Sequence, residues 1–149
     1  MRREETVDYA IKAAWHAIAR MYNQQAAKHD ITTSMGFVLL NIHSEGTPAT
    51  KIAPLIGLEA RSLSRLLKTM EEKGLIYREA HAADKRMVRV VLTKEDKKKK
   101  ERSRETVLRF NDAVRDYVDA DKLNVFFQVL QDIQKIVDGK SNIYQHVSS

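Results

Sequence analysis

The stretch from Leu58 to Thr93 constrains the fold more than any other part of the chain, because a helical pattern gives way there to a strand pattern. Gly74, just past the helical segment, supplies the left-handed conformation that commonly ends a helix. Residues 75–79 and 87–92 then have strand character around a polar loop. The helical segment, about Glu59 to Lys73, carries its apolar side chains on one face: Leu63, Leu66, Leu67 and Met70. This order predicts a helix followed by a β-hairpin.

The opposite face of the predicted helix is basic and hydroxylic. Arg61, Arg65 and Lys68 recur at steps of four and three. Ser62 and Ser64 lie beside them. The planar fork of arginine matches guanine O6 and N7, and small hydroxylic side chains allow a helix to approach base edges closely. Such a face is typical of a helix that reads the major groove, although a surface helix with salt bridges would show the same spacing.

A second short helix is expected before this one. Thr47 followed by Pro48 predicts its start, with a hydroxyl cap and then proline at the first helical position. Gly57 ends it, and Pro54 removes a backbone hydrogen bond inside it, so we expect a bend or a loosened turn there. Two short helices joined by a turn at Gly57 predict a helix-turn-helix.

A cationic hairpin follows the predicted recognition helix directly. Val88, Val90 and Leu92 alternate with other residues and are expected to face inward. The loop before them contains Arg86, which could enter a narrow minor groove, where the negative potential is deepest. A basic hairpin in this position predicts the wing of a winged helix.

The positive charge of the chain is concentrated on this central part. Residues 59–104 hold 15 Lys/Arg against 8 Asp/Glu, whereas the remainder holds 11 against 12. A localised basic patch attracts phosphate because binding releases condensed counterions. An ordinary solvated surface is the alternative for a charge run taken alone. The lysines at 97–100 spread around their helix, so we favour a solvated helix start for them over direct phosphate contact.

Long amphipathic helices are expected to flank the central part. The first, over residues 3–28, has a broad apolar stripe that fits either a subunit interface or core packing within one chain. Thr33 or Ser34 is the expected cap of a short, mostly buried helix. Thr93 is expected to cap a long helix after the hairpin, and Asp121 is expected to cap the last helix.

Several motifs together resemble a known family. They are IAPLIGL at 52–58, SLSRLLKTMEEKGLI at 62–76, Asp84-Lys85-Arg86, and Val90-Val91-Leu92-Thr93. In these motifs and in the layout of its helices the chain resembles the MarR-type (multiple antibiotic resistance regulator) winged helix-turn-helix transcription factors. The resemblance implies a mainly α fold with a small β-wing, and an obligate homodimer whose first and last helices interlock.

The resemblance also implies how one domain over residues 1–149 is organised. Residues 31–103 would form the winged helix-turn-helix DNA-binding lobe. Residues 1–30 and 104–138 would form a helical dimerisation lobe, and residues 139–149 a polar tail.

The resemblance assigns roles to individual residues. Arg65, like the two serines of its helix, would face the major groove, Arg86 would occupy the minor groove, and Asp84 would support it through a salt bridge. Pro54 and Asp96 depart from the family pattern, which commonly has a charged residue and a glycine at these positions. The expected DNA contacts are Arg61, Ser62, Ser64, Arg65, Lys68, Asp84, Lys85 and Arg86.

Other functions find little support in the sequence. The absence of cysteine excludes a thiolate metal site and a cysteine nucleophile. The five histidines lack metal-ligand spacing, and no phosphate-cradling glycine loop is present. We therefore expect no cofactor, no metal and no enzyme. No apolar run approaches the roughly 20 residues of a membrane helix, so a cytoplasmic protein without a membrane contact is expected.

The expected function is a homodimeric repressor that binds a pseudo-palindromic DNA operator and responds to a small-molecule effector. The alternative is a constitutive or architectural DNA-binding protein without an effector. In the family, effectors lie between the dimer helices and the DNA-binding lobe. The candidates at that location are Trp15, His16, Arg20, Met35 and His43, although such side chains are also common in a core.

Overall fold

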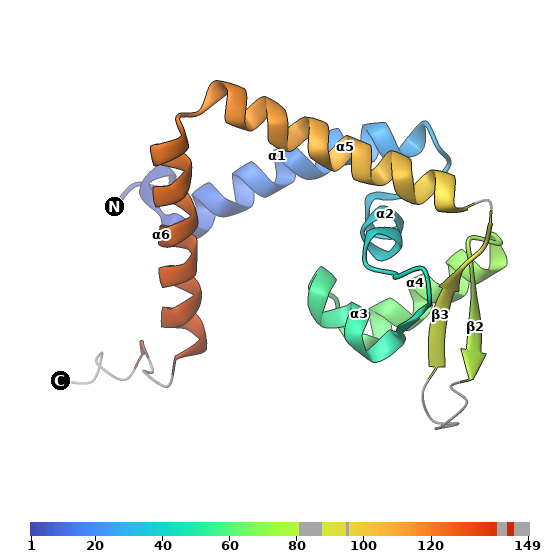
Figure 1. Ribbon diagram of the computed structural model, residues 1–149. Coiled ribbons are helices and arrows are strands. Elements are labelled where there is room, and N and C mark those ends of the chain that lie inside the picture. The colour runs from blue at the N-terminus through green and yellow to red at the C-terminus, as the bar shows by residue number, and fades with distance from the viewer. Residues whose placement is uncertain (81–87, 95, 140–142, 145–149) are drawn as a thin grey trace. The chain divides into compact units, whose positions relative to one another are not determined.

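The computed structural model describes residues 1–80, 88–94, 96–139 and 143–144. The chain is mostly helical with a small antiparallel sheet, which confirms the expected fold class (Figure 1). It divides into two compact units, Met1–Val107 and Leu108–Ser149. The elements are η1 (Arg3–Glu5), α1 (Val7–Ala27), α2 (Thr33–Leu40), β1 (Thr47–Pro48), α3 (Ala49–Ile56), α4 (Ala60–Glu72), β2 (Ile76–Ala80), β3 (Val88–Leu92), α5 (Asp96–Tyr117) and α6 (Ala120–Asp138).

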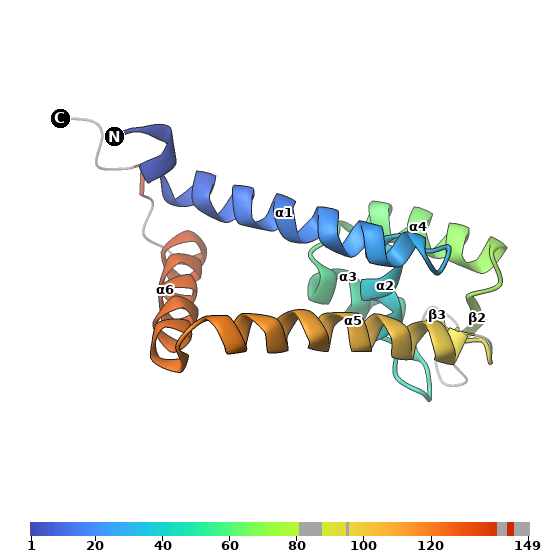
Figure 2. The same cartoon turned by 90° about the horizontal axis from the view of Figure 1, so that it is seen from above.

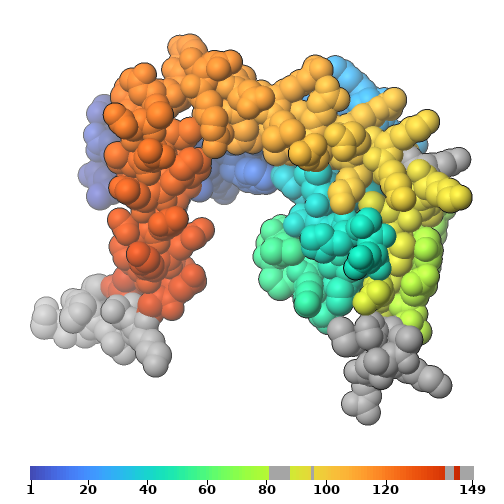
Figure 3. Space-filling view, in the orientation of Figure 1, coloured from blue at the N-terminus to red at the C-terminus, as the bar shows by residue number. Residues whose placement is uncertain are grey.

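The hydrophobic core of the first unit lies among α2, α3, α4 and the sheet. Its most deeply buried side chains come from each of these elements: Val38, Leu39, Ile42, Ile52, Leu67, Met70, Ile76 and Val90. The first turns of α5 pack on α2 on the face seen in Figure 3. There the Lys100 amine donates to the main-chain carbonyl of Ile42, just past the end of α2. The core therefore holds the helix-turn-helix and the hairpin as one body.

The sheet has three strands in the order β1-β3-β2, and all neighbours are antiparallel. The sequence predicted two strands and placed Thr47 as a helix cap, which is wrong. Thr47 pairs with Val90 in the sheet, and its hydroxyl accepts from the amide of His43 at 2.9 Å. Pro48 is the N-cap residue of α3 instead.

The turn before β1 depends on a glycine. Gly46 has φ of +92°, and a Cβ there would lie 2.6 Å from the Cδ of Arg89 on β3. Only glycine fits this combination of backbone conformation and close approach. The α2–β1 turn therefore packs directly on the strand that continues from the wing.

Helix starts differ from the sequence prediction at several places. A 3₁₀ turn precedes α1, which begins at Val7. Thr32, not Thr33 or Ser34, caps α2, because its hydroxyl accepts from the amide of Met35 at 3.2 Å. The N-cap residue of α6 is Asp119, so Asp121 lies in its first turn. Caps depend on the local backbone conformation, which helical periodicity does not resolve.

Helix α3 continues through Pro54 to Ile56, and Gly57 adopts the left-handed conformation with φ of +69°. The expected stop at Gly57 is confirmed, and so is the stop of α4 at Gly74, with φ of +73°. The start of α5 differs from the expectation. It begins at Asp96, and the hydroxyl of Thr93 contacts the Asp96 carboxylate and the carbonyl oxygen of Gly74.

The hairpin strands pair in register from Ile76↔Leu92 to Ala80↔Val88. Val90 and Leu92 are buried as expected. Val88 is 39% exposed, so its expected inward burial is wrong. It lies at the outer end of the strand, where the core no longer covers the sheet.

Helices α1 and α6 differ from the winged region in their exposure. The amino-terminal half of α1 leaves Val7, Ile11 and Trp15 at 43–56% exposure, and only Tyr22 of this helix is buried. Helix α6 has no buried residue. In the described part of the chain, large apolar side chains of both helices are thus exposed.

Candidate nucleic-acid interface

Helix α4 presents its two faces as predicted. Leu63, Leu67 and Met70 are buried in the core, with Leu66 partly buried against it. The five side chains of α4 that are expected to contact DNA are all exposed: Arg61, Ser62, Ser64, Arg65 and Lys68. The core thus fixes the rotation of α4 about its own axis, and that rotation fixes which side chains face solvent.

The turn before α4 brings the helix-turn-helix together. The left-handed Gly57 reverses the chain, and the amide of Leu58 donates to the carbonyl of Ala53 at 3.1 Å. Figure 1 shows α3 and α4 meeting at this turn, with α2 above them. Thr50 and Lys51 on α3 are also exposed.

In the described part of the chain, carboxylates do not pair with the cationic side chains on the exposed face of α4. Among the described residues, no ion pair involves Arg61, Arg65 or Lys68. The ion pairs near this helix are formed at its carboxyl-terminal end, by Glu71 with Arg78 at 3.1 Å and by Lys73 with Asp30 at 4.0 Å. Within that part of the chain the exposed face is therefore not salt-bridged, which disfavours the alternative interpretation of its spacing.

The structure describes the strands of the wing but not the loop between them. Asp84, Lys85 and Arg86 lie outside the described residues, so their expected contacts stay predictions. The strands that border them are described, and Arg78 of β2 is tied to Glu71 of α4.

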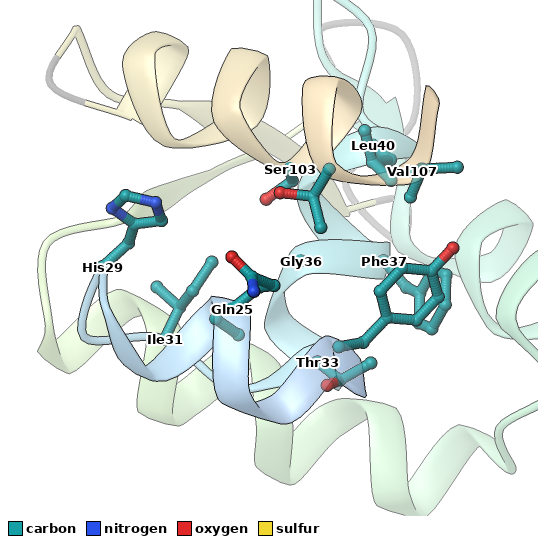
Figure 4. A pocket seen from close by; sticks show the side chains of 12 residues that line it. Gln25, His29, Ile31, Thr33, Gly36, Phe37, Leu40, Ser103 and Val107 are labelled. Carbon is teal, nitrogen blue, oxygen red and sulfur yellow. The ribbon is translucent and has the colours of Figure 1, made fainter. Parts of the chain in front are cut away.

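A pocket opens between α1, α2 and α5. Figure 2 shows α1 and the first half of α5 side by side, with α2 beneath them. The pocket has a cavity volume of about 40 Å³ and is open to solvent. It is lined by Tyr22, Gln25, Ala26, His29, Ile31, Thr33, Gly36, Phe37, Leu40, Ser103, Thr106 and Val107 (Figure 4).

The pocket combines an aromatic end with a polar end. Phe37 lies at one end and His29 at the other in Figure 4. Tyr22 meets Phe37 edge-on at 6.0 Å between ring centroids. Burial raises the pKa of Tyr22, so its phenol stays neutral. At the polar end the guanidinium of Arg102 lies 3.1 Å from Nδ1 of His29, and since guanidinium only donates, this nitrogen accepts. This lining suits a small, partly aromatic molecule with polar groups.

The sequence candidates for an effector site do not line this pocket. His16, Arg20 and His43 are exposed, and Met35 is buried in the core. Trp15 is stacked on Phe37, which lines the pocket, at 6.3 Å between ring centroids. The lining residues come from three separate segments, each with helical spacing, and the sequence alone does not show which helix faces meet.

Among the described residues, no group of three or more His, Asp or Glu side chains could hold a metal ion. No helix in that part of the chain is both long and apolar enough to cross a bilayer.

The chain is similar to known regulators over much of its length. HTH-type transcriptional regulator TtmR of Methylorubrum extorquens (strain PA1) is 34% identical over 86 residues, which are 57% of this chain and 44% of TtmR. The chain thus spans less than half of TtmR. The uncharacterized HTH-type transcriptional regulator YwoH of Bacillus subtilis (strain 168) is 32% identical over 116 residues, which are 76% of this chain and 84% of YwoH.

Solved structures share the fold. The S. aureus MepR–DNA complex has a TM-score of 0.81 at 21% identity and covers 89% of this chain and 98% of MepR. PcaV of Streptomyces coelicolor, solved in complex with its natural ligand, has a TM-score of 0.77 at 18% identity and covers 93% of this chain and 98% of PcaV. The model of the MarR family matches residues 31–88, the region of α2, α3, α4 and the hairpin. Together with the match to most of YwoH, this shows that the chain belongs to the MarR family.

Proposed function

We propose that this protein is a sequence-specific DNA-binding transcriptional regulator that works as a homodimer. The observation that carries the proposal is the exposed cationic face of α4, held in place by a buried core and free of ion pairs among the described residues. The similarity to HTH-type regulators and to a DNA-bound fold supports it.

Each part of the winged region has a proposed role. Arg65 reads bases in the major groove with Ser62 and Ser64 beside it, while Arg61 and Lys68 contact mainly phosphates. In the wing, Arg86 enters the minor groove, and Asp84 and Lys85 support it there. Two copies related by a two-fold axis place their recognition helices about 34–36 Å apart, which matches a pseudo-palindromic operator.

The exposed apolar faces supply the proposed dimer contact. Phe126 and Phe127 lie 43–50% exposed on α6, and Val7 and Ile11 lie exposed on α1. Residues 1–30 and 104–138 would bury these faces between two chains. We expect such a regulator to act in the cytoplasm and to repress by occupying its operator.

Selection of genomic fragments by the purified protein tests the DNA-binding proposal. We expect enrichment of a two-fold symmetric site. The logarithm of the binding constant should fall linearly with the logarithm of the salt concentration. A gel shift on the selected duplex and on random duplexes at low salt gives the decisive result. Failure to retard any duplex would overturn the proposal and favour a protein-interaction module.

The pocket between α1, α2 and α5 is the proposed effector site. Residues of α2 line the pocket, and α2 packs on the helix-turn-helix. A ligand that binds more tightly to one arrangement of α1 and α5 therefore changes the fraction of molecules in the DNA-binding conformation. Similarity to the ligand-bound PcaV fold supports this. None of the first candidates Trp15, His16, Arg20, Met35 and His43 lines this pocket, and of these Trp15 stacks on its lining residue Phe37.

The only tryptophan of the chain offers a direct readout of this pocket. Trp15 stacks on Phe37, which lines the pocket. A ligand that moves Phe37 therefore changes Trp15 fluorescence. In a metabolite screen we expect a compound that changes both this fluorescence and operator affinity, and Ser103→Phe, which fills the pocket, should abolish both responses. A saturating screen without any response would favour the constitutive alternative.

A further inference from the structure

The start of α5 contains a buried carboxylate that the DNA-reading face does not use. Asp96 is only 1% exposed, and with Thr47 it makes up the buried polar residues among those described. A buried carboxylate is costly unless it is hydrogen-bonded, and the start of a helix is a favourable place for it. Its burial therefore indicates that the carboxylate makes a hydrogen bond that stabilises this part of the fold.

Asp96 contacts Thr93, and Thr93 joins three elements. The Thr93 hydroxyl contacts the Asp96 carboxylate, and it lies 2.8 Å from the carbonyl oxygen of Gly74. Backbone bonds complete the joint, because the Thr93 amide donates to the Leu75 carbonyl at 3.3 Å and the Asp96 amide donates to the Thr93 carbonyl at 3.1 Å. The end of α4, the end of β3 and the start of α5 therefore meet at one pair of side chains.

A small rotation at this joint would displace the outer end of the wing strands. Strand β3 ends at Leu92, directly before Thr93, and its outer end is Val88. With about 3.3 Å per residue from Thr93 to Val88, the outer end stands roughly 17 Å from Thr93. A tilt of about 10° at the joint would therefore move that end by about 3 Å, which is enough to lose a hydrogen-bonded groove contact.

We propose that Thr93 and Asp96 act as a positioning pair that sets the wing relative to the recognition helix α4. Asp96 touches no DNA in this proposal; its carboxylate and the carbonyl oxygen of Gly74 share the single hydroxyl proton of Thr93, which holds this side chain between the start of α5 and the turn that ends α4. The pair thereby fixes the angle between the two elements that must enter neighbouring grooves together. This inference rests on the proposed DNA-binding function for its consequence, but its structural part can be tested without DNA.

The absence of cysteine makes the structural test clean. Spin labels at Glu72→Cys on α4 and Glu79→Cys on β2, both exposed, report one α4–wing distance in full-length protein diluted with unlabelled chains. We expect Thr93→Val and Asp96→Asn to broaden or shift this distance distribution, and Thr93→Ser to restore the narrow distribution. Glu71→Gln, which removes the exposed ion pair at the same joint, should leave it unchanged, because such pairs contribute little. An unchanged distribution in Thr93→Val would overturn the positioning role.

A double-mutant cycle on the selected operator tests the consequence. Asp96→Asn should lower operator affinity on the order of tenfold, the cost of one well-placed groove contact. Its effect should be non-additive with Arg86→Ala in the wing and additive with Arg65→Ala in α4. Additive effects in both cycles would mean that Asp96 only stabilises the fold, and the proposal would fail. If Asp96→Asn does not fold, Thr93→Val and Thr93→Ser carry the same cycles.

The two proposals fail in different ways. If the wild-type protein binds no duplex, the proposed function fails while the spin-label distances still decide the positioning role. If the wild-type protein binds its operator and the variants match it in distance and affinity, only the positioning role fails.

Discussion

The winged region and helix α6 carry similar apolar residues, but the winged region buries them and α6 leaves them exposed. In the winged region, Leu39, Ile52 and Val90 are completely buried within one chain. On α6, Val125, Val129, Ile136 and their neighbours remain 43–69% exposed, with no residue buried. The winged region therefore completes its own core, whereas α6 leaves large apolar side chains exposed, which is what the proposed dimer contact requires.

The largest effect on assembly and DNA binding is expected when the apolar face of α6 is made polar. The double substitution Phe126→Glu and Phe127→Glu should give a monomer, because it places charges on the most aromatic part of the exposed face. Loss of the second half-site contact should weaken operator binding by roughly 10²-fold or more. Sedimentation velocity and a binding titration measure the two effects, with the exposed Gln128→Glu as the matched control. A dimer with unchanged affinity would contradict the role given to α6.

A truncation inside the winged region tests the other side of the comparison. Leu39→Ala should lower the free energy of unfolding by about 2–5 kcal/mol, because it leaves a cavity in a packed core. Val129→Ala on α6 removes a similar group from an exposed position. In the monomeric background described above, it should change stability by less than about 0.5 kcal/mol. Urea unfolding of both variants gives the comparison, and equal losses would mean that α6 is already packed within one chain.

Arg65→Ala should separate recognition from assembly. We expect a loss of roughly 1–3 kcal/mol in discrimination at one operator position if the contact is bidentate, because alanine cannot donate to guanine. The dimer and the melting temperature should not change, since Arg65 is exposed and outside the core. Binding to an operator library measures the preference, with the exposed Lys122→Ala of α6 as a charge control. An unaltered preference would remove Arg65 from base readout.

Arg86→Ala should have the smallest effect of the four. It removes one charge from the wing, so the slope of log affinity against log salt should become shallower by about one. Titrations at several salt concentrations measure this slope, and Lys122→Ala again serves as the control. A slope equal to that of the wild-type protein would show that the wing stays off the phosphates and the minor groove.

Much of the winged region could be predicted because its signals are local. Buried Leu63, Leu67 and Met70 recur at the helical period, so the opposite face, with Arg65, had to be exposed. Gly57 and Gly74 mark the helix ends because a left-handed conformation favours glycine wherever it occurs. Propensity and periodicity act over a few residues, and a single sequence displays them directly.

Tertiary structure alone decided the features that join distant segments. Strand β1 exists because Thr47 and Pro48 pair with Val90 and Arg89, some forty residues later, and two residues carry no strand pattern of their own. The pocket draws Gln25, Thr33 and Ser103 from three helices, and the burial of Asp96 follows from its contact with Thr93 at a joint with the end of α4. The sequence by itself determined which faces are apolar and which cationic; packing decided what each face covers, because that depends on neighbours that the local pattern does not contain.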